Sequence, residues 1–211
     1  MTQDNVRANS GWERVDEGVL EQFRKHSVAN LGDALDRLNI ADGGIAPIWA
    51  GAKAVGTALP VLTVAGDNKA VIDALEHIRP GDILVINAFG HDGRAIIGDN
   101  LAQRFAVFGA VGAIVDGYVR DGAIIEKLGV PVFARGLTPA GPFKNGPGTI
   151  GEPVAIGGVV VNPGDIVAAD DDGVIVIPPH RAEEALAGVE AIVAREASLD
   201  AEVEALRSQI A

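Results

Sequence analysis

The chain has 211 residues, a length that suits one folded domain with its own hydrophobic core. Apolar residues make up 48 %, which excludes a disordered chain, and the lack of cysteine excludes disulfides, thiolate metal sites and cysteine nucleophiles. The formal net charge of −12 argues against nucleic-acid binding, because such binding needs a basic face that neutralises phosphates.

The sequence also argues against a membrane protein. Residues 1–10 are polar and lack the apolar core of a signal peptide. The longest apolar stretches, such as residues 106–115, are far shorter than the roughly 20 residues of a membrane-spanning helix. We therefore expect a cytoplasmic protein that binds neither a membrane nor nucleic acid.

Predicted helices and strands alternate in the first half of the chain. The first 40 residues are expected to be helical, since residues 31–38 repeat apolar side chains at helical spacing. The elements expected next are a strand over 55–64, a helix capped by Asp67 that runs to about His77, a turn at 80–82 and a buried strand over 83–86. Asp99 or Asn100 starts the following helix, which extends through Phe108.

Strands dominate the second half. The predicted elements are a strand over 113–115 that ends at Asp116, a short helix over 123–128, and strands over 130–133, 154–161, 166–169 and 174–177. Turn signals at 162–165 and 170–173 separate the last three strands. A long helix over about 179–208 follows. The pattern predicts one mixed α/β domain over residues 1–211, with a helix at each end.

The first candidate site is the segment Gly98, Asp99, Asn100 and Leu101 at the start of a predicted helix. A glycine at this place leaves backbone N–H groups unshielded, and those groups bind carboxylate or phosphate together with the helix dipole. The alternative interpretation is an ordinary helix N-cap.

Arg120 and Asp121 form the second candidate site, directly after a buried strand, where α/β proteins place functional groups. Arg120 can hold a carboxylate in a bidentate fork, and Asp121 can bind a hard cation through oxygen. In an acidic chain, the arginine and a cation bound by Asp121 would supply the local positive charge that an anionic substrate requires. The alternative interpretation is a surface turn with a local ion pair.

Glu196 is the third candidate, because it interrupts an apolar series in the last predicted helix. The series consists of Ala185, Val189, Ile192, Leu199, Val203 and Leu206. A carboxylate within an apolar seam is costly unless it meets a cation, an arginine or a neighbouring subunit. The alternative interpretation is that the helix leaves the core near Arg195 and that Glu196 is solvated.

Three further patterns are rejected. Residues 146–151 match the glycine pattern of a dinucleotide-binding loop, but they contain Pro147 and continue into Pro153 rather than a helix. A methyltransferase is disfavoured, because no glycine-rich loop follows a first strand to hold its cofactor. The four histidines show no zinc-ligand spacing.

Twenty residues lie between Asp99 and Arg120, and Asp121 follows directly. This spacing resembles the class II pyruvate aldolases that act on 4-hydroxy-4-methyl-2-oxoglutarate and 4-carboxy-4-hydroxy-2-oxoadipate. Their family includes the RraA-like regulators of ribonuclease activity. The resemblance covers most of the chain, through the segments 30–36, 80–85, 115–117, 130–136 and 162–176.

This resemblance implies a compact α/β/β sandwich of the swivelling-domain type, assembled as a homotrimer or hexamer with the site between subunits. It assigns the anion-binding loop to residues 98–101, stabilisation of the pyruvate carboxylate and enolate to Arg120, and Mg²⁺ or Mn²⁺ ligation to Asp121. The family's glutamate from a neighbouring subunit, which acts through water on the metal, falls on Glu196.

The expected function is that of a divalent-metal-dependent lyase. It would cleave a 4-hydroxy-2-oxo acid to pyruvate and a second oxo acid, and also decarboxylate oxaloacetate. Arg120 and the metal would stabilise the enolate, while Asp99 or Glu196 would orient the water that takes the hydroxyl proton. Groups near His91 or in the N-terminal helix are expected at the far end of the substrate. The alternative is a non-enzymatic RraA-like regulator that binds a protein partner.

Overall fold

The structure is a computed structural model that describes residues 5–210. The first elements are β1 (Val6–Ala8), α1 (Glu17–Phe23) and α2 (Val28–Ala34). The central elements are β2 (Ala46–Pro47), β3 (Ala54–Thr63), α3 (Lys69–Asp73), the 3₁₀ turn Ala74–His77, β4 (Asp82–Ala95), α4 (Asp99–Phe108), β5 (Gly112–Val119), α5 (Gly122–Leu128) and β6 (Val132–Leu137). The last elements are β7 (Gly148–Ile150), β8 (Val154–Ile156), β9 (Val159–Val161), β10 (Ile166–Asp170), β11 (Gly173–Ile177), the 3₁₀ turn Pro179–Arg181 and α6 (Ala182–Ile210).

Four parallel strands form the centre of the main sheet, in the order β3, β4, β5 and β6. The other edge of β3 pairs antiparallel with β10 along its first half and with β7 along its second half. Three more strands extend the sheet: β11 pairs with β10, β1 pairs with β7, and β2 pairs with β6. β8 and β9 form a separate hairpin. Because β3 to β6 run parallel, their carboxyl ends lie at the same edge of the sheet.

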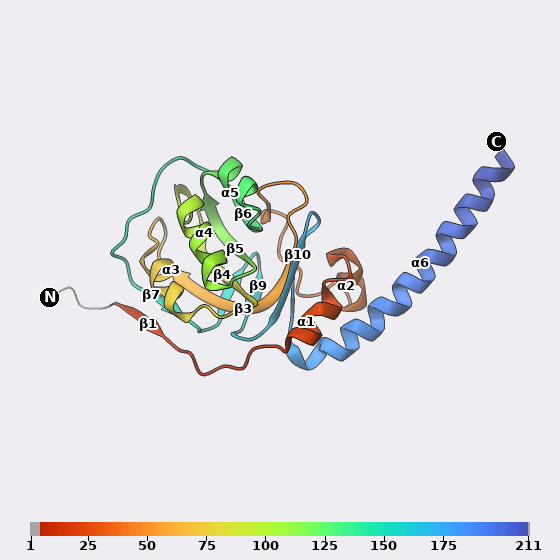
Figure 1. Cartoon of the computed structure of the whole chain (residues 1–211), viewed down its shortest axis with the longest axis horizontal. Coiled ribbons are helices and arrows are strands. Elements are labelled where there is room, and N and C mark those ends of the chain that lie inside the picture. The colour runs from red at the N-terminus through yellow and green to blue at the C-terminus, as the bar shows by residue number, and fades with distance from the viewer. Residues whose placement is uncertain (1–4, 211) are drawn as a thin grey trace.

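Alternating side chains along the strands build the core. In β4, Leu84 and Ile86 face α3, α4 and α5, whereas Ile83 and Val85 face the layer of β8 to β11. β10 and β11 alternate in the same way between this second cluster and a third one beneath α1, α2 and α6. Figure 1 shows the two groups of helices on opposite sides of the strands. The predicted α/β/β sandwich is confirmed, with a further helical layer outside β10 and β11.

The long helix α6 is buried in this layer only through its first turns. Ala185 and Val189 are buried against the third cluster, and α6 packs on α1 and α2. Beyond them the helix extends away from the body of the molecule (Figure 1). The apolar side chains of Leu199, Val203 and Leu206 are exposed there. Among residues 5–210, no helix combines the length and the apolar character needed to cross a bilayer.

The structure corrects the predicted boundaries in the first half of the chain. Helix does not occupy the whole of the first 40 residues: β1 and an extended segment come first, because β1 pairs with β7. The helix begins only after Asp16, whose side chain accepts a hydrogen bond from the Gly18 N–H. The carboxylate of Asp67 does accept the Lys69 N–H, but α3 ends at Asp73 and a 3₁₀ turn replaces the rest of the predicted helix.

Two strand predictions in the second half also change. Residues 154–161 form the hairpin of β8 and β9 rather than one strand, because Gly157 and Gly158 adopt positive φ angles of 49° and 82° and reverse the chain. β5 continues past Asp116 as far as Val119. Residues 146–151, which were rejected as a dinucleotide-binding loop, contain β7 and precede no helix.

Candidate functional site

Functional side chains gather where the parallel strands end. Asn68 follows β3, Gly98 follows β4, Arg120 follows β5 and Lys144 lies in the long connection after β6. All four residues line one cavity of about 310 Å³. Sites of parallel α/β sheets lie at this edge, because the connections to the helices leave the sheet together here.

The turn before α4 is shaped to admit the side chains that follow β5. A Cβ atom at Gly98 would lie 2.5 Å from Asp121 Oδ2 and 3.0 Å from Arg120 Nε. The backbone φ of Gly98 is −137°, so glycine is needed here for space and not for a special backbone conformation. The structure therefore brings Arg120 and Asp121 into direct contact with Gly98, which lies more than twenty residues earlier in the chain.

Arg120 and Asp121 are held in place by the backbone. The Arg120 N–H donates to the Ile97 carbonyl, which joins the end of β5 to the segment before α4. Asp121 has a left-handed backbone with φ of 61°, a conformation that aspartate tolerates better than most residues, and it stands at the N-cap of α5. Arg120 Nε lies 3.2 Å from Asp121 Oδ2. Both side chains remain partly exposed, so a ligand can reach them.

Carboxylates of the chain itself occupy the N-terminus of α4. The Asn100 N–H donates to Asp99 Oδ1 at 2.7 Å, and the Asp99 N–H points to Asp121 Oδ2 at 3.5 Å. This arrangement agrees with the anion preference of a helix N-terminus. A substrate carboxylate that binds the Asn100 N–H would have to displace the carboxylate of Asp99 from it.

The cavity beside this helix end combines polar and apolar walls. Its polar side chains are those of Asn68, Asp99, Asn100, Arg104, Arg120 and Lys144. Isoleucine and leucine side chains from α3 and α4 cover other parts of the wall. A second, more open hollow of about 310 Å³ is bounded by Arg120, Asp121 and Leu137. Arg120 thus stands between the cavity and the hollow that Asp121 faces.

Asn68 is the most buried polar side chain of this wall, at 4 % exposure. Its Nδ2 donates to the Ile96 carbonyl, while its Oδ1 has no hydrogen-bond partner among residues 5–210. Buried acceptors of this kind are rare in proteins. Sequence reasoning missed Asn68, Arg104 and Lys144. Only Arg104 had a local signal, since it lies one helical turn after Asn100.

The two places expected at the far end of the substrate lie away from this cavity within one chain. His91 does not line the cavity, and α1 belongs to the helical layer on the other side of the sandwich. Arg104 and Lys144 occupy the cavity wall instead.

The carboxylate of Asp121 suits a cation that keeps part of its hydration shell. Within residues 5–210, no three histidine, cysteine, aspartate or glutamate side chains are arranged to hold a metal ion. Mg²⁺ is commonly bound by only one or two carboxylates, with water and substrate oxygens completing its octahedron. The carboxylate of Asp121, partly exposed at the open hollow, fits that mode of binding and not a closed protein cage.

Glu196 is not part of this arrangement within one chain. It lies on α6, whose main contacts are with α2, and its Oε2 accepts a hydrogen bond from Asn30 Nδ2 at 2.9 Å. It is exposed, because α6 leaves the core before this position. In the isolated chain, therefore, the helix leaves the core and Glu196 is solvated, as the alternative interpretation of the sequence expected.

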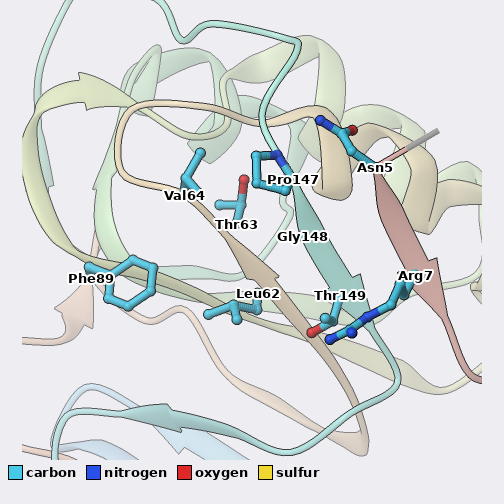
Figure 2. A pocket seen from close by; sticks show the side chains of 9 residues that line it. All are labelled: Asn5, Arg7, Leu62, Thr63, Val64, Phe89, Pro147, Gly148 and Thr149. Carbon is cyan, nitrogen blue, oxygen red and sulfur yellow. The ribbon is translucent and has the colours of Figure 1, made fainter. Parts of the chain in front are cut away.

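A different pocket, of about 360 Å³, lies near β1 and β7. Figure 2 shows the apolar side chains of Leu62, Val64, Phe89 and Pro147 around it, with Arg7 at one end. Its polar groups are few, and none of the predicted site residues lines it. The candidate site is therefore the cavity at the carboxyl ends of the parallel strands, where the predicted residues lie.

The comparisons with known proteins agree with the resemblance found in the sequence. Residues 28–176 match the family model described as RraA-like, Aldolase/RraA. A protein of Halalkalibacterium halodurans with the provisional name 4-hydroxy-4-methyl-2-oxoglutarate aldolase is 40 % identical over 167 residues. The alignment covers 79 % of this chain and 80 % of that protein.

Solved structures show the same architecture. Streptomyces coelicolor RraAS2, described as an unusual member of the RNase ES inhibitor RraA family, has a TM-score of 0.76 and 31 % identity. The match covers 95 % of this chain and all of that one. A Geobacillus kaustophilus protein described as an S-adenosylmethionine:2-dimethylmenaquinone methyltransferase has a TM-score of 0.68 and 34 % identity, over 72 % of this chain and 95 % of that one.

Proposed function

We propose that this chain, which belongs to the RraA-like family, is a divalent-metal-dependent lyase. Its substrate would be a 4-hydroxy-2-oxo acid of the 4-hydroxy-4-methyl-2-oxoglutarate type, cleaved to pyruvate and a second oxo acid. The observation that carries the proposal is the contact of Arg120 and Asp121 with Gly98, beside the cavity that Gly98 and Arg120 line. Arginine and a carboxylate at a helix N-terminus suit the binding of an anion together with a cation.

The reaction breaks the C3–C4 bond of the substrate. The 4-hydroxyl loses its proton, C4 becomes a carbonyl, and the bonding electrons pass to C3 as the enolate of pyruvate, which is then protonated to the methyl group. Arg120 would donate hydrogen bonds to the substrate carboxylate and to the enolate oxygen as its charge develops. A Mg²⁺ or Mn²⁺ ion held by Asp121 would supply Lewis-acid stabilisation of the same oxygens.

Asp99 is the carboxylate of this chain that is best placed to accept the hydroxyl proton, directly or through water. It lines the cavity and precedes the α4 residues that would hold the pyruvyl part. When the substrate carboxylate replaces Asp99 on the Asn100 N–H, the side chain of Asp99 is released toward the substrate. Oxaloacetate decarboxylation forms the same enolate without this proton transfer, so it should accompany the aldolase activity.

The complete site would lie between subunits of a homotrimer or hexamer. The exposed apolar side chains of Leu199, Val203 and Leu206 on α6 support association, since such a stripe is normally covered. A neighbouring α6 packed beside the site would bring its own Glu196 near Asp121. Glu196 would then orient water at the metal, as the resemblance implies.

Pyruvate release tests the proposal. The assay couples release to lactate dehydrogenase and uses 4-hydroxy-4-methyl-2-oxoglutarate or oxaloacetate, each with Mg²⁺ or with excess EDTA. We expect metal-dependent release from both. Release from oxaloacetate alone would retain the enolate chemistry but remove the aldolase.

The second candidate function is that of a regulator that binds a protein, and the structural match to RraAS2 along 95 % of this chain supports it. The absence of release from either substrate would make this the better proposal. The methyltransferase is not proposed, because the sequence has no glycine-rich loop after a first strand, and residues 146–151, which have a dinucleotide-like glycine pattern, contain β7 and precede no helix.

A further inference from the structure

A second hollow of the molecule has the make-up of a binding site and no role in the mechanism above. It is the pocket of about 360 Å³ near β1 and β7, which Figure 2 shows from close by. A volume of this order is typical of sites for small molecules. The pocket shares no residue with the cavity beside Arg120, so the two places are separate.

Strand pairing builds the floor of this pocket. Arg7 of β1 and Leu62 of β3 both pair with Thr149 of β7, so the three side chains form one row across the sheet. Side chains return to the same face of a strand at every second residue. A second row of the floor, two positions along each of the three strands, consists of Asn5, Pro147 and Val64.

One end of the pocket is polar. Figure 2 shows Arg7 and Thr149 together at this end. Thr149 is only 7 % exposed, and its hydroxyl makes no hydrogen bond with any of residues 5–210. Arg7 Nη2 lies 3.7 Å from Glu152 Oε2, but both side chains are exposed, so this ion pair is weak. The guanidinium and the hydroxyl are therefore both available to an anion.

Phe89 bounds the opposite, apolar end. The pairing of β4 with β5 changes register between Asn87 and His91, and Phe89 lies in this irregular stretch. Phe89 has a φ of 58°, and its N–H donates to Asn87 Oδ1 at 2.8 Å. Strained backbone of this kind is concentrated at functional sites. The ring is 64 % exposed and lines the pocket, so an apolar ligand can pack against it.

We propose that this pocket binds a monocarboxylate with a compact apolar body, such as an aromatic acid. The carboxylate would accept hydrogen bonds from the Arg7 guanidinium and the Thr149 hydroxyl. The apolar body would lie on Leu62, Val64 and the ring of Phe89. The proposal does not depend on the lyase function, because it concerns other residues.

The charge of the pocket selects this class of ligand. Arg7 is the one charged side chain among its lining residues. A single cation balances one carboxylate and not two, and the lining offers no carboxylate for a metal ion. The pocket therefore does not suit the metal-bound dianion proposed as substrate beside Arg120. A purely apolar ligand would leave the Thr149 hydroxyl without a partner, which costs binding energy.

Two probes of the same shape isolate the contribution of the carboxylate. 2-Naphthoate and 2-naphthamide share the aromatic body, and they differ in a negative charge against a neutral amide. Isothermal titration of the full chain gives a dissociation constant for each. For the unaltered chain we expect 2-naphthoate to bind at least about tenfold more tightly, as charge-assisted hydrogen bonds produce.

Four variants test the contacts separately. Arg7→Gln should bring the ratio of the two constants to about one, without a change in the affinity for 2-naphthamide. Thr149→Val keeps the shape and should lower the affinity for 2-naphthoate about two- to tenfold. Glu152→Gln should raise it about two- to fivefold, because a competing carboxylate is removed. Phe89→Asn should weaken both probes alike, since asparagine tolerates the left-handed backbone but lacks the ring.

Two matched controls place the probes in this pocket. Arg207→Gln removes an exposed arginine of α6, and Arg120→Ala alters the other cavity. Neither substitution should change the affinity for 2-naphthoate. Sedimentation velocity of the unaltered chain and of Phe89→Asn should give the same mass, because the pocket is assigned to a small ligand and not to a second copy.

Equal affinities for the two probes in the unaltered chain, or no binding of either, would overturn the proposal. A preference for 2-naphthoate that survives Arg7→Gln, or that is lost with Arg120→Ala, would place the anion elsewhere and overturn it as well. A lower mass of Phe89→Asn would show that the pocket is an interface between copies. None of these outcomes affects the test of the lyase, which is pyruvate release.

Discussion

The carboxylate of Asp121 lies over the α-carbon of Gly98, so closely that a Cβ atom there would be 2.5 Å from Oδ2. Gly98 precedes α4 and Asp121 precedes α5, and the two positions meet because β4 and β5 are parallel neighbours. The contact therefore couples the proposed anion loop to the proposed metal ligand. A side chain at position 98 would therefore displace the carboxylate of Asp121.

Gly98→Ala should reduce pyruvate release at least about a hundredfold, as expected when electrostatic groups lose their positions. The φ of Gly98 suits alanine, so the free energy of unfolding should change little. Steady-state kinetics and urea unfolding check the two expectations. Gly43→Ala is the control, because a Cβ at Gly43 meets no atom within 4 Å. Full activity of the Gly98 variant would show that the contact is not needed.

Arg120→Ala should also lose at least about 10²-fold in turnover, which corresponds to about 3 kcal/mol of transition-state stabilisation. Arg120→Lys should recover little, because lysine lacks the planar fork that binds a carboxylate and an enolate oxygen together. Both variants are measured with oxaloacetate, for which no hydroxyl proton has to be removed. Near-normal turnover would refute the role of Arg120.

Asp121→Asn should weaken the binding of Mn²⁺ and abolish metal-dependent activity together. The amide keeps the size of the side chain but removes the charge that a hard cation requires. Mn²⁺ titration followed by electron paramagnetic resonance measures the affinity independently of catalysis. If the titration curve is unchanged, the metal binds elsewhere.

Glu196 is tested by mixing subunits. Glu196→Gln should lower activity about 10- to 100-fold, the usual effect of losing a group that orients metal-bound ligands. When this variant is co-expressed with Arg120→Ala, part of the activity should return, since some interfaces then combine an intact Arg120 with an intact Glu196. Mixtures that remain inactive would place each site within a single chain.

Arg135 provides a prediction about stability. It donates to Asp42 and to the buried Asp116, whose other oxygen accepts the Gly157 N–H, and so it ties together three separate segments. Arg135→Gln should lower the free energy of unfolding by about 2 kcal/mol, because Asp116 loses a charged donor. Arg37→Gln is the control: its ion pair with Asp33 is exposed and should contribute little. Equal effects in urea unfolding would contradict the expectation.

The stability that the Arg135–Asp42 ion pair contributes depends on pH. The hydrogen bonds from Arg135 and from the Gly44 N–H lower the pKa of Asp42 below its ordinary value of 3.8. A depressed pKa in the folded state means that this stabilisation is present above the unfolded pKa and is lost as the pH falls through the folded one. The difference between the original chain and Arg135→Gln should therefore shrink in acid below about pH 4. A constant difference between pH 7 and pH 3 would argue against it.

Much of the fold could be read from local patterns. The buried strands at 83–86 and 113–115 and the helix that begins at Asp99 occur as predicted, because apolar periodicity and capping act over a few residues. Glycine-dependent turns were harder: the reversal at Gly157 and Gly158 divides a stretch that reads as one strand. The pairing of β1 with β7 overrides a helical expectation, since it depends on a partner far along the chain.

The amino-acid sequence by itself determined the family, the α/β class and the choice of Asp99, Arg120 and Asp121 as candidate residues, because these follow from residue order and spacing. Only the tertiary structure decided that Asn68, Arg104 and Lys144 share a cavity with Asp99 and Arg120. The same holds for the exposure of Glu196 on α6. The physical reason is that parallel strands bring their carboxyl ends to one edge, and the identity of the loops that meet there depends on strand order, which no local pattern contains.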